Sequence, residues 1–475
     1  MDVVVRTEGG AVRGEARAGC STFFAIPYAA PLTGVRRFQA PVPASRWDGA
    51  RDARVFGSSV PQPFLWHPGD DPECLTVNVW TPDVTRSGLP VLVWIHGGAC
   101  LGGTAATNDF DGTAYAAAGI VLVTVNYRVG YEGFGWVEDA PGNRGVLDQL
   151  AALRWVHDNI AAFGGDPDAV TLIGQSAGAS SIVGLLASGG GQGLFRRGIA
   201  QSPGKIFVPA DEARAVSAMI TSRLGVRPSA EALAAVPPEQ IHAVQMAPVA
   251  VMAAEPDRWT HPNAPYSLVI DDDLFDAPPW SRTHQRATDR ELICGFTTDE
   301  ARMFTVDADF STADPTDTAR GCGLAPSAVR DYRAANPGIT DEDLHALILS
   351  DALFRIPALW CAEAGADAGR DTYLYEFAWR SPARGGALRA CHGLDVPFTF
   401  DTPHSPLAAG LIGPQVPPEF AALSTALRDA FAAFAATGDP GWPRFDSTER
   451  IQRTWATPPA LDKDSLSASR RIWSR

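Results

Sequence analysis

The stretch of sequence that decides the fold reads Ile173-Gly174-Gln175-Ser176-Ala177-Gly178-Ala179. An apolar run, 169–172, precedes it and a helix-like segment follows as far as Leu186, so we expect a strand, a tight turn and a helix. Ser176 lies at the tip of that turn. A serine hydroxyl is a weak nucleophile, and an enzyme that uses one must expose it beside a base. The flanking glycines let strand and helix approach closely, which is the Gly-x-Ser-x-Gly nucleophile-elbow pattern.

The five-residue pattern does not decide the matter by itself. Glycine contributes 45 of the 475 residues, so the pattern would arise by chance in roughly one such sequence in five. On the motif alone, a glycine-rich turn with an ordinary surface serine is as good an interpretation as a nucleophile. The remainder of the chain has to distinguish the two.

The segments around the motif predict a parallel α/β sheet. Residues 90–95 and 119–125 are nearly continuous apolar runs, typical of strands that are buried on both faces. Before the motif, residues 143–163 carry apolar residues at helical spacing, with Asn143 as the expected N-cap and Gly164-Gly165 as the stop. Strands separated by such a helix form a parallel sheet. Further strands are expected at 75–81, 195–202, 290–296 and 372–377, the last being the final clear one.

Charge and hydropathy argue against several classes of function. The 54 acidic residues outnumber the 39 basic ones, giving a formal charge of −15 without long single-sign runs, which argues against a nucleic-acid or anionic-membrane surface. No stretch approaches the roughly twenty uninterrupted apolar residues that span a bilayer. The first residues lack a basic segment followed by a long apolar one, so we see no secretory signal and expect a cytoplasmic protein.

The cysteines give no sign of a metal or redox centre. They stand at positions 20, 74, 100, 294, 322, 361 and 391 without a Cys-x-x-Cys pair, and we interpret them as buried free thiols. Arginine outnumbers lysine 37 to 2, which suggests a GC-rich bacterial coding sequence and says nothing about a substrate.

The loop His96-Gly97-Gly98-Ala99-Cys100 follows directly after one of the expected central strands. Its small residues leave the backbone N–H groups bare. Acyl transfer passes through a tetrahedral oxyanion, and each preorganised N–H donor aimed at it is worth a factor of about 10²–10³ in rate. The N–H group of Ala177, directly after the candidate nucleophile, would add a donor. Phosphate binding is a weaker interpretation, because no Gly-Lys-Ser/Thr follows the glycines.

An acid and a base are sought after Ser176, because proteins of the α/β-hydrolase type order their triad as nucleophile, acid and histidine. Asp299 and Glu300 follow the strand expected at 290–296, and spacing does not separate them; a helix N-terminal charge pair is the alternative interpretation. Three histidines come later. His345 lies on an apolar helical face and His404 among prolines in an expected surface loop, whereas His392 lies in a loop shortly after a sheet strand and is the preferred base.

Most of the chain resembles the type B carboxylesterase and cholinesterase family. The matching signatures are Phe24-Ala25-Ile26-Pro27-Tyr28-Ala29, Arg37-Phe38, Cys74 through Trp80, Trp94 through Ala99, Asn126-Tyr127-Arg128, Gly142 through Gly145, Asp148-Gln149, Ala152 through Val156, Asn159-Ile160 and Phe163 through Pro167. Together these signatures are highly specific.

The resemblance implies an α/β-hydrolase fold, in which helices flank a central, mostly parallel, twisted sheet and large helical and loop insertions cover the active site. It implies that Ser176 is the nucleophile, Glu300 rather than Asp299 the acid, and His392 the base. It also implies a small-molecule ester substrate and no metal or organic cofactor. The remaining site residues that it implies are the oxyanion donors Gly98, Ala99 and Ala177, with Gly97 shaping the loop.

The sequence departs from the family pattern at a few positions. The family usually pairs the cysteine matching Cys74 with one just before a Pro-Gln dipeptide, but Val60 stands there, so that disulfide is absent, in agreement with a reducing compartment. Cys100 stands where an aromatic residue or leucine is common, and we expect a wider acyl pocket. Residues 267–273 and Ala301 replace the more usual Pro-Val-x-Asp-Gly and glycine. Substrate preference is therefore the family property that can be inferred least for this chain.

We interpret residues 1–475 as a single carboxylesterase domain with lid-like insertions at about 205–290 and 302–370. Two other functions suit the same scaffold. One is an esterase-like enzyme of specialised metabolism that performs acyl transfer or cleaves thioesters, carbamates or lactones. The other is a non-catalytic binding protein, against which the presence of all three triad candidates argues. The sequence predicts neither the substrate's size nor the oligomeric state.

Overall fold

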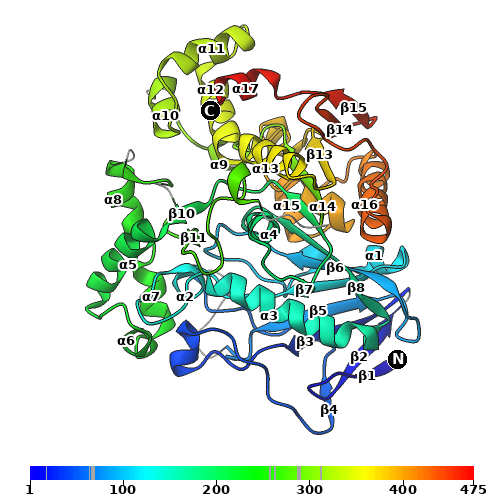
Figure 1. Ribbon diagram of the computed structural model, residues 1–475. Helices are drawn as coiled ribbons and strands as arrows, with labels where there is room; N and C mark the ends of the chain where they lie inside the picture. Colours follow the sequence, from blue (N-terminus) through cyan, green and yellow to red (C-terminus); the bar gives the residue numbers. More distant parts are fainter. Residues whose placement is uncertain are drawn as a thin grey trace.

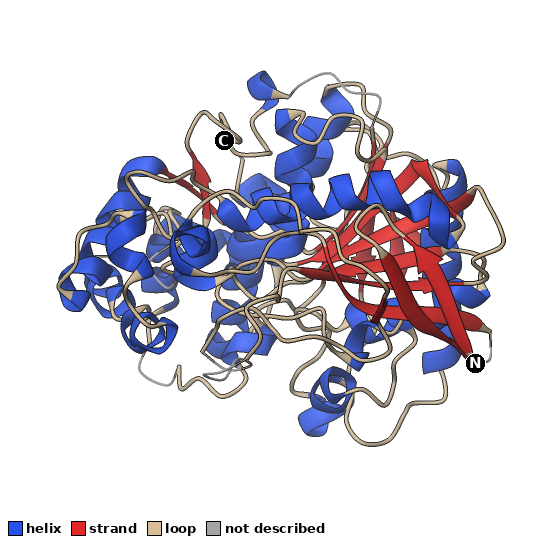
Figure 2. Cartoon of the chain, turned by 90° about the horizontal axis from the view of Figure 1, so that it is seen from below, coloured by secondary structure: helices blue, strands red, loops and turns tan. Residues whose placement is uncertain are grey.

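The main sheet has thirteen strands. Figure 2 shows it as a twisted fan in the right half of the view, with helices filling the left half. The computed structural model describes residues 1–17, 19–63, 65, 70–255, 258–261, 264–285, 290–310 and 313–474. The strand order is β1-β2-β3-β5-β7-β6-β8-β9-β12-β13-β14-β15, with β4 paired on β2. The strands of this sheet are β1 (Asp2–Arg6), β2 (Ala11–Arg17), β3 (Cys20–Pro27), β4 (Ala50–Asp52), β5 (Thr76–Thr81), β6 (Leu89–Ile95), β7 (Val121–Val125), β8 (Gly165–Gln175), β9 (Arg197–Gln201), β12 (Glu291–Thr297), β13 (Thr372–Phe377), β14 (Ile451–Trp455) and β15 (Ala460–Lys463).

The central part of the sheet is parallel, as predicted. Strands β7, β6, β8, β9, β12, β13 and β14 pair in parallel in that order. At one edge β1, β2, β3 and β5 join antiparallel, and at the other β15 pairs antiparallel with β14. The expectation that 372–377 is the final strand is wrong. Gln452 and Arg453 interrupt the apolar pattern of β14, because this strand lies near the edge of the sheet.

Helices cover both faces of the sheet (Figure 1). They are α1 (Thr113–Ala117), α2 (Gly130–Phe134), α3 (Arg144–Asn159), α4 (Ala177–Ser188), α5 (Ala210–Leu224), α6 (Ala230–Ala234), α7 (Pro238–Val244), α8 (Pro248–Ala254), α9 (Arg302–Thr305), α10 (Pro315–Gly321), α11 (Ser327–Ala335), α12 (Asp341–Ser350), α13 (Ile356–Asp367), α14 (Asp395–Phe400), α15 (Pro406–Leu411), α16 (Phe420–Thr437) and α17 (Ser467–Ile472).

Successive residues of the central strands feed two separate hydrophobic cores. Along β6, Val93 belongs to one core, whereas Leu92 and Trp94 belong to the other. This follows from the two-residue period of a strand, whose side chains point alternately to opposite faces. Helices α3, α4 and α13 supply the first core, and α14, α15 and α16 the second. The continuous apolar runs in the sequence therefore mark strands that are covered on both faces.

Asn143 occupies the N-cap position of α3 but does not cap the helix with its side chain. Its backbone is left-handed, with φ of 51°. The carboxamide donates to the carbonyl oxygen of Val269 and accepts from the N–H of the same residue, both at 2.8 Å. The predicted helix start is confirmed, while the side chain instead pairs with β11 (Leu268–Ile270), which forms a small parallel sheet with β10 (Phe207–Pro209).

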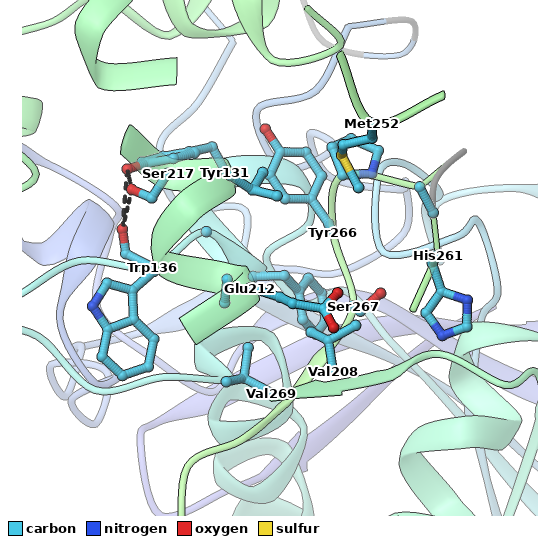
Figure 3. A pocket seen from close by; sticks show the side chains of 16 residues that line it. Tyr131, Trp136, Val208, Glu212, Ser217, Met252, His261, Tyr266, Ser267 and Val269 are labelled. Atoms are coloured by element: carbon cyan, nitrogen blue, oxygen red, sulfur yellow. Dashed lines mark hydrogen bonds between the residues drawn. The ribbon is translucent and has the colours of Figure 1, made fainter. Parts of the chain in front are cut away.

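The segment that contains β10, α5 and β11 packs against α2 around a small cavity of about 20 Å³ (Figure 3). The hydroxyls of Tyr131 and Ser217 both donate to the carbonyl oxygen of Trp136, at 3.0 and 2.7 Å. A space of this size holds about one water molecule. It is therefore excluded as a substrate site, and neither Ser176 nor His392 lines it.

Residues 341–367 form a helical stretch that is long and apolar enough to cross a membrane by length and composition. It joins α12 and α13 through a π-helical turn, Asp351–Arg355. Of its most apolar window, 78% is buried inside the protein, where Leu344 and Leu359 contribute to the first core. We interpret it as a core helix.

A buried ion pair ties the segment that follows β7 to α3. Arg128 donates from Nε and Nη2 to the carboxylate of Asp148, at 2.8 and 2.6 Å, and the two side chains are 1% and 0% exposed. The remaining nitrogen, Nη1, donates to the carbonyl oxygens of Arg37 and Gln39. The pair therefore also fixes the N-terminal segment against the sheet.

We expect Asp148→Asn to lower the free energy of unfolding by about 3–5 kcal/mol, because it leaves the buried charge of Arg128 uncompensated. Urea unfolding at pH 7 measures this difference. The matched control is Asp158→Asn on the same helix, where the carboxylate is 46% exposed beside His157, and it should cost less than about 0.5 kcal/mol. Equal losses in the two variants would contradict the central role of the Arg128–Asp148 pair.

Candidate active site

Ser176 lies between the last residue of β8 and the first of α4, which confirms the predicted strand, turn and helix. Its φ of 56° and ψ of −123° lie in a region that residues with side chains rarely occupy, at a cost on the order of 1–3 kcal/mol. Two hydrogen bonds hold this conformation. The N–H of Ser176 donates to the carbonyl oxygen of Gln201, and its own carbonyl accepts from the N–H of Ser180, both at 2.9 Å.

Glycines let the elbow approach β6. A Cβ atom on Gly174 would lie 2.7 Å from the carbonyl oxygen of Ile95, and one on Gly178 would lie 2.1 Å from the same oxygen. Both distances are below any real carbon–oxygen contact, so a side chain at either position would push α4 away from the sheet. The sequence expectation of close strand–helix approach is confirmed.

Glu300 and His392 meet at the carboxyl edge of the sheet. Glu300 Oε2 lies 2.6 Å from His392 Nδ1, with the carboxylate fully buried and the histidine 8% exposed. Glu300 Oε1 accepts from Ser202 Oγ at 2.6 Å and from the N–H of Thr297 at 2.8 Å. The N–H of His392 donates to the carbonyl oxygen of Glu300 at 3.1 Å. The carboxylate is thus fixed from two sides and its second oxygen faces the imidazole.

The other candidates lie elsewhere. Asp299 faces Arg389, at 3.7 Å, rather than His392. His345 is buried within α12, where Nδ1 lies 2.6 Å from the hydroxyl of Thr318. His404 is exposed in the turn before α15. Geometry therefore separates two adjacent carboxylates that spacing alone left equivalent.

The second ring nitrogen of His392 contacts Gln175, the residue before the candidate nucleophile. The two Nε2 atoms lie 2.9 Å apart, and the glutamine is buried. Because Glu300 accepts at Nδ1, that nitrogen carries the hydrogen of a neutral imidazole, and Nε2 accepts from the carboxamide. Within the described residues no hydrogen bond joins Ser176 Oγ to His392. Sequence reasoning missed this role of Gln175.

We expect Gln175→Glu to shift the acid limb of kcat/KM to higher pH by about one unit, because a carboxylate beside His392 favours the protonated ring. The matched control is Gln175→Met, which has similar size and no charge and should leave the limb in place. The measurement is the pH dependence of ester hydrolysis by wild type and both variants. An unshifted limb in Gln175→Glu would show that this side chain does not face His392 in solution.

The loop after β6 lies against Ser176. A Cβ atom on Gly97 would lie 3.0 Å from Cβ of Ser176. Gly98 has φ of 118°, and its carbonyl oxygen accepts from the N–H groups of Leu101 and Gly102, so the loop closes on itself. The N–H groups of Gly98, Ala99 and Ala177 have no hydrogen-bond partner in the described part of the chain, and Gly98 and Ala99 are exposed.

The side chain of His96 holds the start of this loop in place. Its Nδ1 lies 2.8 Å from the carbonyl oxygen of Gly97, and its ring stacks on Tyr127 with centroids 4.3 Å apart. The hydroxyl of Tyr127 donates to the carbonyl oxygen of His96 at 2.5 Å. Burial lowers the pKa of His96 to about 4, so the ring is neutral at physiological pH.

Two aromatic rings cover His392. Phe354 stacks on the imidazole with centroids 4.0 Å apart, and Phe304 lies 5.5 Å away. Phe354 is buried, whereas Phe304 is 57% exposed. Both come from the segment 302–370.

A second carboxyl group, Asp395, lies behind the acid–histidine pair. The hydroxyl of Tyr375 and the carboxamide of Gln201 both donate to its Oδ2 at 2.9 Å. Burial, and then the charge of Glu300, raise the pKa of Asp395 to about 6. Sequence reasoning missed Asp395 and Ser202, although Ser202 stands at the carboxyl end of an expected parallel strand, where functional groups gather.

The raised pKa of Asp395 predicts how the stability of the protein depends on pH. In the unfolded chain this carboxyl has a pKa of 3.8, so the folded protein binds the extra proton between about pH 4 and pH 6. Stability should therefore fall as pH rises through this window, by about 3 kcal/mol for this group. Asp395→Asn keeps an acceptor for Tyr375 and Gln201, and its stability should not show this fall with rising pH. Urea unfolding of wild type and Asp395→Asn at pH 4.5 and 7 measures this pH-dependent stability. An equal change of the unfolding free energy with pH in the two proteins would contradict the role of Asp395.

The comparisons with known proteins agree with this geometry, which defines a serine hydrolase on an α/β-hydrolase fold. The carboxylesterase family profile matches residues 1–463. The para-nitrobenzyl esterase of Bacillus subtilis is 31% identical, over 98% of each chain. The phenmedipham hydrolase of Pseudarthrobacter oxydans is 33% identical over 93% of this chain and 92% of its own. The crystal structure of the carboxylesterase EST55 of Geobacillus stearothermophilus superposes with a TM-score of 0.87 at 32% identity, over 99% of this chain and 100% of that one.

The chain belongs to the carboxylesterase family. It is a carboxylic ester hydrolase, as the sequence predicts, and a small-molecule ester is its class of substrate.

Proposed function

We propose that Ser176 is the nucleophile of this esterase, His392 its general base and Glu300 the acid that orients the imidazole. The observation that carries the proposal is the 2.6 Å contact between Glu300 and His392, in a fold that holds Ser176 in a strained conformation at a strand–helix turn. A buried carboxylate at Nδ1 leaves Nε2 as the proton acceptor.

The reaction proceeds in two halves. Ser176 Oγ bonds to the ester carbonyl carbon while its proton passes to His392 Nε2, and the carbonyl oxygen takes up the displaced electron pair. Collapse of this intermediate breaks the bond to the alcohol oxygen, which receives the proton from His392. A water molecule then attacks the acyl-enzyme by the same route and releases the acid. In the first step Ser176 replaces Gln175 as the hydrogen-bond donor to Nε2.

The oxyanion hole is formed by the N–H groups of Gly98, Ala99 and Ala177, with Gly97 shaping the loop. Support comes from the lack of partners for these three groups within the described chain and from the contact of Gly97 with Ser176. Each donor of this kind is worth a factor on the order of 10²–10³ in rate.

Residues 1–475 act as a single catalytic domain in which the segments 205–290 and 302–370 cover the site. Phe304 and Phe354 over His392 support this for the second segment. The first segment joins the second through the N–H of Lys205, which donates to the carbonyl oxygen of Leu353 at 2.9 Å. The exposed ring of Phe304 suits an ester with an apolar body, and Cys100 leaves room in the acyl pocket.

A cytoplasmic location in a bacterium is proposed as well. All seven cysteines are free, and six of them are buried, which suits a reducing compartment. The excess of arginine over lysine suits a GC-rich bacterial genome.

We expect Ser176→Ala to lower kcat for nitrophenyl esters by a factor on the order of 10⁴ or more, because it removes the hydroxyl that accepts the acyl group. Turnover of short, medium and long acyl esters by wild type and variant measures the loss and sizes the acyl pocket. The control is Ser188→Ala at the far end of α4, which should retain full activity. Undiminished turnover by folded Ser176→Ala would overturn the assignment of the nucleophile.

A further inference from the structure

The side chain of Arg389 joins the loop that carries His392 to the segment 302–370. Arg389 lies three residues before His392, in the loop after β13. Its Nη2 donates to both carboxylate oxygens of Asp343 on α12, at 2.8 and 3.0 Å, and its Nη1 lies 3.7 Å from Asp299 Oδ1. One guanidinium therefore contacts both the loop after β12 and a helix of the segment 302–370.

Backbone hydrogen bonds connect the two loops at the same point. The N–H of Asp299 donates to the carbonyl oxygen of Ala390 at 2.8 Å, and the N–H of His392 donates to that of Glu300 at 3.1 Å. The N–H of Ala390 also donates to Asp299 Oδ2 at 3.4 Å. The position of Arg389 therefore affects where Glu300 and His392 meet.

Ion pairs, rather than close packing, hold the Arg389 side chain. The residue has φ of 49°, in the left-handed region, where a conformation persists only when its surroundings fix it. The side chain borders a cavity of about 240 Å³ and is 32% exposed, so it has room for other rotamers. Its contacts with Asp343 and Asp299 therefore select the observed position.

Asp343 is itself held by Arg302, at the start of α9. Arg302 forms an ion pair with Asp343 and another with Glu342 at 2.7 Å, and it is 4% exposed. Its N–H donates to the carbonyl oxygen of Asp299 at 2.9 Å. Helices α9 and α12 contact each other, in the upper part of Figure 1. The ion pairs of Arg302, Asp343 and Arg389 thus run continuously from the loop after β12 to the loop after β13.

We propose that Arg389 is a positioning residue for ester hydrolysis. Its ion pairs with Asp343 and Asp299 hold the loop of the base against the loop of the acid. Without these ion pairs the contact between Glu300 and His392 is less well held, and proton transfer through the imidazole slows. The inference rests on the proposed function, in which Glu300 and His392 act together.

The test measures hydrolysis of 4-nitrophenyl butyrate by the full-length protein, with kcat expressed per active site titrated by a fluorophosphonate. Counting sites in this way excludes unfolded protein from the rate. Arg389→Gln should lower kcat about tenfold and change KM less than about twofold, because Arg389 acts on the geometry of the triad and not on substrate binding. Arg389→Lys keeps the charge and should restore kcat to within about threefold of wild type.

Asp343→Asn tests the same link from α12. It should lower kcat about as much as Arg389→Gln does. The double variant should be no slower than the slower single variant, because both changes remove one interaction. Additive losses of kcat in the double variant would overturn the proposal.

The matched control is Arg384→Gln. Arg384 lies in the same loop with φ of 55° and pairs with Asp307 of the segment 302–370 at 2.6 Å, but its side chain is 48% exposed. Because exposed pairs of this kind contribute little, the variant should keep the kcat and KM of wild type. Equal losses of kcat in Arg384→Gln and Arg389→Gln, or wild-type kcat in Arg389→Gln, would overturn the positioning role.

The same measurements separate this inference from the proposed function. If Ser176→Ala hydrolyses the ester as fast as wild type, the proposed function fails and the inference falls with it. If Ser176→Ala is inactive and takes up no fluorophosphonate, while Arg389→Gln has wild-type kcat, the proposed function stands and the role of Arg389 alone fails.

Discussion

The close approach of two glycines to one carbonyl group determines where Ser176 lies relative to the sheet. Gly174 and Gly178 both lie against the carbonyl oxygen of Ile95, at distances that no side chain tolerates. Their contact lets α4 begin directly beside the end of β6. Ser176 is thereby held next to the loop that starts at His96, and its strained backbone is one consequence of that packing.

The register of the parallel strands then gathers the rest of the site. Gly174 pairs with Ile95 on one side and with Ala200 on the other, so β6, β8 and β9 end at the same level. Strand β12 joins in the same register and delivers Glu300 beyond its end. His392 comes from further along the chain, and its loop is anchored when the N–H of Asp299 donates to the carbonyl oxygen of Ala390. Residues more than 200 positions apart thus meet without any local signal between them.

This arrangement explains what could be read from the sequence. The central strands, the elbow and the start of α3 depend on local spacing, and each was predicted. Strand β14 was not predicted, because polar residues interrupt its apolar pattern, as suits a strand near the edge of the sheet. The side chain of Asn143 was expected to cap its own helix, but it pairs with Val269, a partner 126 residues away. Spacing left the neighbours Asp299 and Glu300 equivalent, and the family resemblance implied Glu300. The tertiary structure supplies the physical reason, because Glu300 faces His392 whereas Asp299 faces Arg389.

A neutral side chain suits position 175, beside the Nε2 atom of His392. A carboxamide donates through its NH₂ group to a neutral imidazole and, after rotation about its last bond, accepts from a protonated one. A carboxylate would favour the charged ring alone, and a thioether would satisfy neither state well. Gln175 therefore contacts His392, the proposed base, when no substrate is present, and it adds no charge beside Glu300 and Asp395. Because two carboxyl groups already lie behind the ring, a third would hold the proton that His392 gives to the leaving alcohol in the proposed mechanism.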